Sequence, residues 1–383
     1  MPDRITELPR RLLRRGPIHA WWLARQTRRW ERAYCNEILR PSPKPAAAAT
    51  PPSFSTSAPL RTILCIADCM CEEQYLAPEL RKLAAVILFD LRPVLQAKPA
   101  SQPESEAVAT AISAFAQAQA QLAPDVILFY ARPKLLSEEV FHTLRQRWRC
   151  PLFGISMDDK MEFFPYGIFR VGGGDDYQQW ARKFDLNLTN CLPATDWYRQ
   201  RGLPCLYVPN GFHRPDGLRP PESLGYKHEF SFLGSSKPER RAVIDRLLAA
   251  GVPIQLFGAG WPSSQWVDDP NAIYRLTQIN LGIGLASPSL TLTTLKGRDF
   301  ECPGVGACYL TTYSWELANL YDVGKEILCY QSVEELIEMF TWYRRRPEEC
   351  LRIAQAAWRR CGEEHTWEQR YRKVFQQTGF KLA

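Results

Sequence analysis

The stretch Lys296-Gly-Arg-Asp-Phe-Glu-Cys-Pro-Gly-Val-Gly306-Ala-Cys-Tyr-Leu310 carries more information about the fold than any other part of the chain. It places two cations, Lys296 and Arg298, and the carboxylate Glu301 ahead of a Gly-x-Gly turn and an apolar run. A helix through this stretch would set Arg298 one turn from Glu301. The glycines of the following loop allow bare backbone to approach a phosphate or a second strand. This arrangement suits a ligand with a diphosphate at one end and a diol at the other.

Short apolar runs alternate with helical stretches on the N-terminal side of this segment. We predict strands at residues 62–67, 85–89, 126–130, 152–156, 186–189 and 205–208, with helices at 104–122 and 137–147. Runs of this length are typical of buried parallel strands. Their alternation with helices predicts a parallel sheet covered on both faces.

A second alternating set begins after the proline-rich residues 215–221. We predict strands at 230–233, 253–257, 279–285, 307–311 and 326–330, and a helix at 238–250 that Gly251 ends. Capping boxes at Ser332 and Thr366 begin two late helices. The fold class is therefore α/β, with Rossmann-like domains at 60–215 and 216–366. Residues 367–383 are expected to form a C-terminal helix that packs back on the first domain.

The order of motifs in the C-terminal half carries a resemblance to a known family. The residues concerned are Lys296, Arg298, Phe300, Glu301, Gly306, 324–327, Tyr330, 334–336, His365, Thr366 and Arg370. This order resembles the C-terminal domain of the CgeB/YkvP-type glycosyltransferase-like family, a branch of the GT-B superfamily. The resemblance implies two facing Rossmann-like domains, the first binding an acceptor and the second a nucleotide-sugar donor.

The resemblance also implies roles for residues of the donor side. Glu301 would accept hydrogen bonds from the ribose hydroxyls; the alternative is an ion pair with Arg298 or Lys296. Residues that would bind the diphosphate and stabilise the leaving group are Lys296, Arg298, Lys237, Arg240, Gly234, Ser235, Gly258, Gly304 and Gly306. For Lys237 and Arg240 the alternative is a solvated first helical turn. The superfamily often has Glu-x7-Glu ending at Glu301, but here position 293 is Thr.

Three carboxylates follow predicted strands directly and are candidates for a general base or an acceptor contact. Asp158 and Asp159 follow the strand at 152–156, and Asp68 follows the strand at 62–67. Arg298 completes the candidate catalytic set, through its charge. A loop position or a helix cap is the alternative for each aspartate. The chain has no Asp-x-Asp, and the resemblance implies catalysis without a metal or cofactor, the nucleotide-sugar being a substrate.

The charge of the chain is concentrated at its N-terminus. Residues 1–40 hold ten arginines against four carboxylates, which leaves little of the formal charge of +7 for the remaining body. We therefore expect no nucleic-acid partner, because such a surface requires a basic folded domain. The arm, helical and rich in Trp, is expected to dock on its own protein, on a partner or on an anionic membrane.

The composition of residues 41–59 and the spacing of the cysteines indicate a linker and a cellular location. Residues 41–59 read as a Pro/Ala-rich linker. The twelve cysteines lack zinc or disulfide spacing, which favours reduced thiols in a cytoplasmic protein, with peripheral membrane contact through the arm.

The sequence thus predicts a glycosyltransferase that moves a sugar from a nucleoside-diphosphate sugar to a glycan, protein or lipid-linked acceptor. One alternative is a non-catalytic GT-B protein that binds nucleotides or glycans in surface or spore-coat assembly. Another is a membrane-docked scaffold that acts through its arm.

Overall fold

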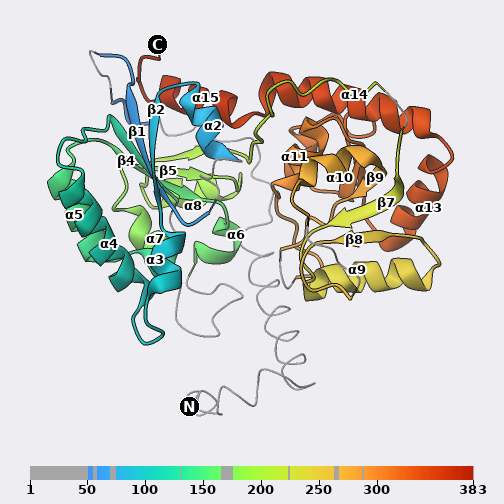
Figure 1. Ribbon diagram of the computed structural model, residues 1–383, viewed down its shortest axis with the longest axis horizontal. Helices are drawn as coiled ribbons and strands as arrows, with labels where there is room; N and C mark the ends of the chain where they lie inside the picture. Colours follow the sequence, from blue (N-terminus) through green and yellow to red (C-terminus); the bar gives the residue numbers. More distant parts are fainter. Residues whose placement is uncertain are drawn as a thin grey trace.

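The computed structural model describes residues 51–54, 58–69, 75–130, 132–164, 176–222, 225–262, 267–286 and 289–382. These residues form two lobes side by side, each built on its own parallel β-sheet (Figure 1). The two Rossmann-like halves predicted from the sequence are confirmed. The predicted basic arm, residues 1–40, lies outside the described residues.

The N-terminal lobe holds a six-stranded sheet in the order β2-β1-β3-β4-β5-β6. Its strands are β1 Thr62–Ala67, β2 Ala85–Asp90, β3 Val126–Tyr130, β4 Leu152–Ser156, β5 Leu186–Thr189 and β6 Cys205–Tyr207. Its helices are α2 Leu76–Arg81, α3 Arg92–Ala97, α4 Glu104–Ala118, α5 Glu138–Arg147, α6 Asp159–Glu162, α7 Tyr177–Ala181 and α8 Ala194–Gln200, with the short 3₁₀ helix η1 Pro133–Leu135. Every residue of β3, β4 and β5 is buried, because other elements pack on both faces of the sheet.

The C-terminal lobe holds a five-stranded sheet in the order β11-β10-β9-β7-β8. Its strands are β7 His228–Leu233, β8 Gln255–Phe257, β9 Thr277–Leu281, β10 Tyr309–Thr312 and β11 Leu328–Tyr330. Its helices are α9 Pro238–Ala249, α10 Pro270–Leu276, α11 Arg298–Gly304, α12 Trp315–Ala318, α13 Val333–Tyr343 and α14 Pro347–Glu364. Pro238 begins α9, and Gly251, with φ of 73°, follows its end as predicted.

Two element boundaries near the site differ from the sequence-based prediction. The strand predicted to run to residue 285 ends at Leu281, because the chain then leaves the sheet and Leu285 pairs with Thr293 in an antiparallel bridge. Helix α11 begins only at Arg298, so Lys296 precedes it. Lys296 is therefore held by a loop rather than by the helix.

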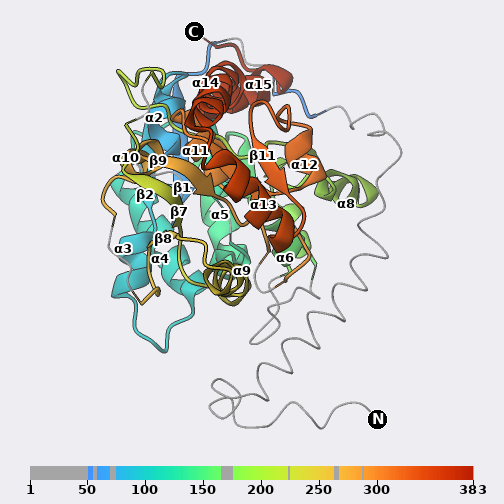
Figure 2. The same ribbon diagram turned by 90° about the vertical axis from the view of Figure 1, so that its right-hand side faces the viewer.

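The last helix, α15 Trp367–Gln377, returns to the N-terminal lobe, and α14 and α15 lie end to end (Figure 1). Both helices lie at the top of the molecule in Figure 2. Trp367, Tyr371 and Phe375 belong to the same buried cluster as residues of β1 and β3. A capping box at Thr366 begins this helix. Two hydrogen bonds join the two segments in which the chain passes between the lobes. The N–H of Phe212 donates to the carbonyl of His365 at 3.1 Å, and the N–H of Trp367 donates to the carbonyl of Phe212 at 3.2 Å.

The end of the predicted linker is not free. The ring of Phe54 lies 5.5 Å from that of Phe153 and 6.3 Å from that of Phe380, and its N–H donates to the carbonyl of Thr378 at 2.8 Å. Proline-rich composition does not reveal this contact, because a single aromatic residue is enough to dock the segment. Phe54, near the end of the predicted linker, therefore packs on the core of the N-terminal lobe.

Candidate functional site

The predicted donor residues gather at the carboxyl ends of β7 and β8. Gly234 follows β7 directly, and Gly258 follows β8. Open parallel sheets bind ligands at this edge. A Cβ at Gly258, whose φ is 102°, would lie 2.8 Å from the main-chain carbon of Gly234. Only glycine lets the two loops approach this closely.

Two guanidinium groups flank Gly234. Arg298 donates to the carbonyl of Leu233 at 2.6 Å, and Arg240 donates to the carbonyl and hydroxyl oxygens of Ser235 at 2.8 and 3.1 Å. Both also lie over the ring of Phe232, at 5.2 Å for Arg298 and 5.9 Å for Arg240. Within the described residues, neither guanidinium makes an ion pair with a carboxylate. Their charges are therefore available to an anion bound at the end of β7.

Lys296 adds a third positive charge to this cluster. Burial, together with the positive charges of Arg298 and Arg240, lowers the pKa of Lys296 to about 8, although the charge of Asp158 acts in the opposite direction. Burial likewise lowers the pKa of Arg240 to about 10, helped by Arg298. Like charges held together in a partly desolvated place are poised to accept a polyanion. We call Arg240, Lys296 and Arg298 the cation cluster.

Glu301 lies one turn along α11 from Arg298, as predicted. Burial raises the pKa of the Glu301 carboxyl to about 7, although Arg298 acts in the opposite direction. No hydrogen bond or ion pair of this carboxylate is found within the described part of the chain, so its oxygens can accept hydroxyl groups. Gly297 leaves room for it, since a Cβ there would lie 2.7 Å from Glu301 Oε1.

Other predicted donor residues fall into two groups. Ser235 and Lys237 are exposed at the start of α9, where Lys237 is the N-cap residue without a side-chain cap bond. Gly304 and Gly306 lie at the far end of α11, before β10, and so at the opposite edge of the sheet. A Cβ at Gly304 would lie 2.5 Å from the ring of Phe212, and one at Gly306 would lie 2.8 Å from Pro221. The structure gives these two glycines a packing role and does not place them with the cation cluster.

The three candidate carboxylates of the N-terminal lobe have different surroundings. Asp158 is half-buried, and its charge acts on both Lys296 of the other lobe and Tyr130 at the end of β3. Asp68, which is 7% exposed, forms an ion pair with Arg132 through one oxygen. Its other oxygen, Oδ1, is buried and has no hydrogen-bond partner among the described residues. Of the three, Asp158 is the carboxylate whose charge acts on Lys296 of the cation cluster.

Asp159 points into the N-terminal lobe and is fully buried. Its carboxylate accepts from the hydroxyl of Ser156 at 2.6 Å and from that of Tyr198 at 3.2 Å. Burial raises the pKa of this carboxyl to about 7. The structure does not bring Asp159 to the cation cluster, because its partners lie within the core of its own lobe.

Sequence reasoning did not identify the aromatic residues around the donor side. The indole Nε1 of Trp261 donates to the carbonyl of Gly234 at 2.7 Å and fixes the loop after β7. The hydroxyl of Tyr274 is buried without a hydrogen-bond partner within the described residues. Burial raises the pKa of Tyr274, and the negative charge of Glu301 also raises it. The sequence signal for Trp261 was its place after Gly258-Ala-Gly260.

His365 has the structural role that its place beside a capping Thr suggests. Its Nε2 lies 3.0 Å from the carbonyl oxygen of Leu320, and Nδ1 lies 2.9 Å from Nη2 of Arg370. Burial and the charge of Arg370 lower its pKa to about 3. A neutral imidazole therefore accepts at Nδ1 and donates at Nε2, where the chain crosses between the lobes.

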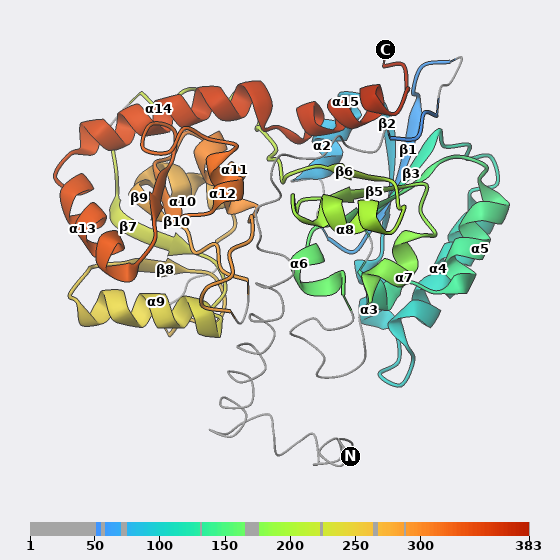
Figure 3. The same ribbon diagram turned by 180° about the vertical axis from the view of Figure 1, so that it is seen from behind.

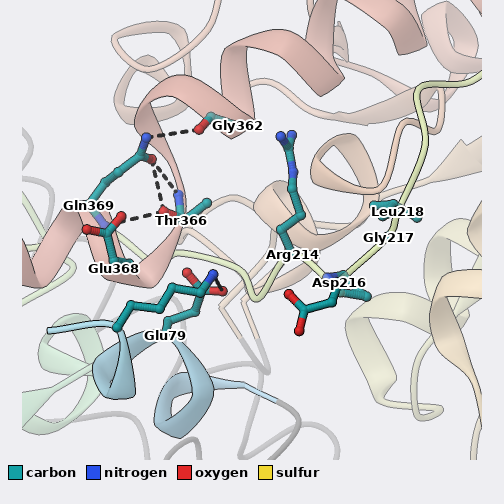
Figure 4. Close-up of a pocket in the computed structure, with 11 residues that line it drawn as sticks. Glu79, Arg214, Asp216, Gly217, Leu218, Gly362, Thr366, Glu368 and Gln369 are labelled. Atoms are coloured by element: carbon teal, nitrogen blue, oxygen red, sulfur yellow. Dashed lines mark hydrogen bonds and ion pairs between the residues drawn. The ribbon is translucent and has the colours of Figure 1, made fainter. Parts of the chain in front are cut away.

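A polar pocket of about 310 Å³ lies at this crossing (Figure 4). Glu79 of α2, Arg214 of the crossing segment and Glu368 of α15 are among its lining residues. Glu79 is buried and pairs with Lys82 at 2.7 Å and His213 at 2.8 Å. None of the predicted donor or acceptor residues lines this pocket.

Each cysteine that the structure describes is a free thiol. No group of three or more metal-ligating side chains suited to an ion occurs among the described residues. None of the helices in the described part of the chain is both long and apolar enough to cross a membrane.

Comparisons with known proteins agree with this architecture. Residues 240–376 match a family model described as glycosyl transferase-like. A search of the curated proteins found no match. Sucrose-phosphate synthase from Thermosynechococcus elongatus is similar in structure, with a TM-score of 0.56 and 13% identity over 82% of this chain and 99% of that one. Anabaena HepE in complex with UDP-glucose gives a TM-score of 0.55 and 14% identity over 82% and 98%. The chain therefore has a GT-B α/β fold, with a glycosyl transferase-like match over most of its C-terminal lobe.

Proposed function

We propose that this protein is a glycosyltransferase that uses a nucleoside-diphosphate sugar as donor. The observation that carries the proposal is the cation cluster: Arg240 and Arg298 flank Gly234, the charge of Lys296 acts together with theirs, and none of the three has a carboxylate ion pair in the described residues. The match of residues 240–376 and the UDP-glucose held by structurally similar HepE support a nucleotide-sugar as the ligand.

The donor is proposed to lie with its diphosphate on the cation cluster. As the bond between the anomeric carbon and the phosphate oxygen breaks, negative charge accumulates on the diphosphate, and nearby cations stabilise it most at that moment. The guanidinium groups of Arg240 and Arg298 are already held by main-chain carbonyls, so little reorganisation is needed. The three charges supply what a divalent metal supplies elsewhere, and we propose that transfer is metal-independent.

Glu301 is proposed to bind the ribose. Its raised pKa results from burial, and two hydroxyl donors would stabilise the ionised form and reverse the shift. The carboxylate lies on the same short helix as Arg298, so one helix would bind both the ribose and the diphosphate.

Asp158 is proposed to be the general base. An acceptor hydroxyl bound between the lobes would transfer its proton to the Asp158 carboxylate as its oxygen bonds to the anomeric carbon, and the nucleoside diphosphate leaves. Asp158 is favoured over Asp68 because its charge reaches Lys296 of the donor side, whereas Asp68 is paired with Arg132. The proposed acceptor is the hydroxyl of a glycan, protein or lipid-linked molecule.

A second candidate function is nucleotide-sugar or glycan binding without turnover. Two observations favour it: Thr293 stands where the superfamily often has a carboxylate, and the ion pair of Asp68 leaves only Asp158 as a free candidate base. Donor binding is common to both functions, whereas release of nucleoside diphosphate in the presence of acceptor belongs to the first alone.

The first test is thermal stabilisation by UDP, GDP, CDP, dTDP and ADP on the wild-type chain, on Glu301→Ala and on the surface control Glu338→Ala. A nucleotide at 100 times its dissociation constant adds about 2.7 kcal/mol to the free energy of unfolding. We expect one nucleotide to stabilise the wild type and the control, and Glu301→Ala to lose about 1–3 kcal/mol of binding free energy. If no nucleotide stabilises the folded wild-type chain, the proposed function is wrong.

A further inference from the structure

Asp158, Asp159 and Lys160 are consecutive, and their side chains interact with three different parts of the protein. The charge of Asp158 acts on Lys296 of the cation cluster, and the carboxylate of Asp159 is hydrogen-bonded within the N-terminal lobe. Lys160 reaches across to the C-terminal lobe, where it forms an ion pair with Glu316 and donates to the carbonyl of Thr293 at 3.0 Å. The side chains of Lys160 and Glu316 are only 5% and 1% exposed.

Both ends of this ion pair are tied to the opposite lobe. Glu316 Oε2 accepts from Lys160, and Glu316 Oε1 accepts from the N–H of Leu192 at 3.0 Å, immediately ahead of α8. Every one of these three contacts joins the N-terminal lobe to α12 or to the loop after β9. Figure 3 shows α6 and α8 in one lobe and α12 in the other. Ala286 and Leu292 of the same loop pack in the core cluster of the N-terminal lobe.

A buried ion pair of this kind contributes more to geometry than to stability. Removing two charges from water costs about as much free energy as their attraction returns, so replacing both partners with uncharged groups is often neutral. Removing one partner leaves a buried charge unpaired and is costly. The pair is therefore satisfied at one relative placement of the two lobes, and a shift of either lobe leaves both charges poorly solvated.

We propose that Lys160 and Glu316 are positioning residues that fix Asp158 against the donor. The carbonyl of Asp158 accepts from the N–H groups of Met161 at 2.7 Å and Glu162 at 2.9 Å, so Asp158 and Lys160 move as one turn of chain. Anchoring Lys160 on Glu316 and Thr293 thereby holds Asp158 at one distance from Lys296. The catalytic consequence rests on the proposed function; the interlobe contact itself does not.

The decisive variant is the double substitution Lys160→Met with Glu316→Gln, which removes both charges at similar volume. We expect its thermal stability to remain near that of the wild type, while kcat falls about 10²-fold, the loss that a displacement of about 1 Å between reacting groups produces. The dissociation constant for the nucleoside diphosphate should change by less than about twofold, because the cation cluster lies wholly in the C-terminal lobe. The single variant Lys160→Arg should recover part of kcat.

The matched control is Lys183→Met, which removes an exposed ion pair with Glu138 inside the N-terminal lobe. It should leave kcat and the nucleotide affinity unchanged. Small-angle X-ray scattering gives a readout that needs no activity: the double variant should show a larger radius of gyration than the wild type and the control. If the double variant is folded and keeps both the wild-type kcat and the wild-type radius, the proposal is overturned.

Failure of the proposed function has a different signature. A wild-type chain that binds no nucleotide would exclude donor use, yet a larger radius in the double variant would still establish the interlobe contact. If the double variant does not fold, the comparison of Lys160→Arg with Lys160→Met replaces it, because Lys160→Arg keeps both the charge and a donor for the carbonyl of Thr293 and Lys160→Met removes both. A compact fold in Lys160→Arg but not in Lys160→Met supports the pair as the interlobe contact, and the same behaviour in both variants contradicts it.

Discussion

The guanidinium of Arg298 donates to the main-chain carbonyl of Leu233 at 2.6 Å and so joins the first turn of α11 to the end of β7. This bond aligns a half-buried cation with the loop at Gly234. Because the carbonyl fixes only one of the guanidinium nitrogens, the remaining donors can turn to a ligand. Arg298 is therefore held in place by the end of β7 and supplies positive charge that the proposed reaction needs.

Replacement of Arg298 by Ala should reduce turnover more than donor binding. The charge on the diphosphate is greatest in the transition state, and loss of one such donor costs about 10²–10³ in kcat. Steady-state kinetics with the nucleotide-sugar identified by thermal shift provide the measurement. Arg246→Ala on the exposed face of α9 is the control and should retain wild-type kcat. An increase in KM at constant kcat would instead assign Arg298 to ground-state binding.

Gly234→Ala should weaken nucleotide binding without unfolding the chain. The new Cβ would lie 2.2 Å from Nη1 of Arg298 and 3.3 Å from Nη1 of Arg240, so both cations must move. Overpacking usually costs about 1–3 kcal/mol of stability, and we expect the displacement of the two cations to cause a loss of nucleotide affinity in addition. Isothermal titration with the nucleoside diphosphate measures it.

Gly251→Ala is the control that distinguishes a loss of nucleotide affinity from a general loss of stability. Gly251 has a φ of 73° and no heavy atom within 4 Å of a new Cβ, so alanine there strains the backbone far from the site. Its melting temperature should fall while its nucleotide affinity stays unchanged. Equal losses of affinity in both glycine variants would show that the effect of Gly234→Ala is a general loss of stability.

Nucleotide affinity should decrease as pH rises above about 8. Burial lowers the pKa of Lys296 to about 8 in the free protein, and a bound diphosphate raises it. Binding therefore takes up a proton above pH 8, and the dissociation constant should increase by at most about tenfold per pH unit. Lys296→Arg keeps its charge throughout this range and should bind with a flat profile from about pH 7.5 to 9.5. A wild-type profile as flat as that of Lys296→Arg contradicts the assignment.

Asp158→Asn should lower the rate of the reaction and Asp159→Asn should lower the stability of the fold, although the two residues are adjacent. Loss of a general base at Asp158 should lower kcat by about 10²–10⁴ while the melting temperature stays near the wild-type value. Asp159→Asn should cost about 1–3 kcal/mol of stability, because Ser156 and Tyr198 lose a carboxylate partner in the core. Thermal melts and initial rates on both variants test the pair. A full rate in folded Asp158→Asn would remove Asp158 from the mechanism.

The sequence by itself determined the two α/β halves and named the residues of the cation cluster among a longer list of donor candidates. Buried parallel strands need continuous apolar runs, so patterns such as those of β3 and β4 are visible without a structure. Residues that directly follow such strands, among them Gly234, Gly258 and Asp158, could be placed at the carboxyl edge of a sheet. Each of these inferences depends on local order along the chain.

Only the tertiary structure decided which of these residues act together. Glycine indicates a close approach but not its partner: Gly234 lies beside Arg298, whereas Gly306 packs against Pro221. The direction of a side chain after a strand depends on what surrounds it, so Asp159 turned inward to Ser156. Lys160 could not be assigned from sequence, because Glu316 is 156 positions away and meets it only when the two lobes are packed. Contacts between distant segments are set by how the folded domains pack, and no local pattern encodes them.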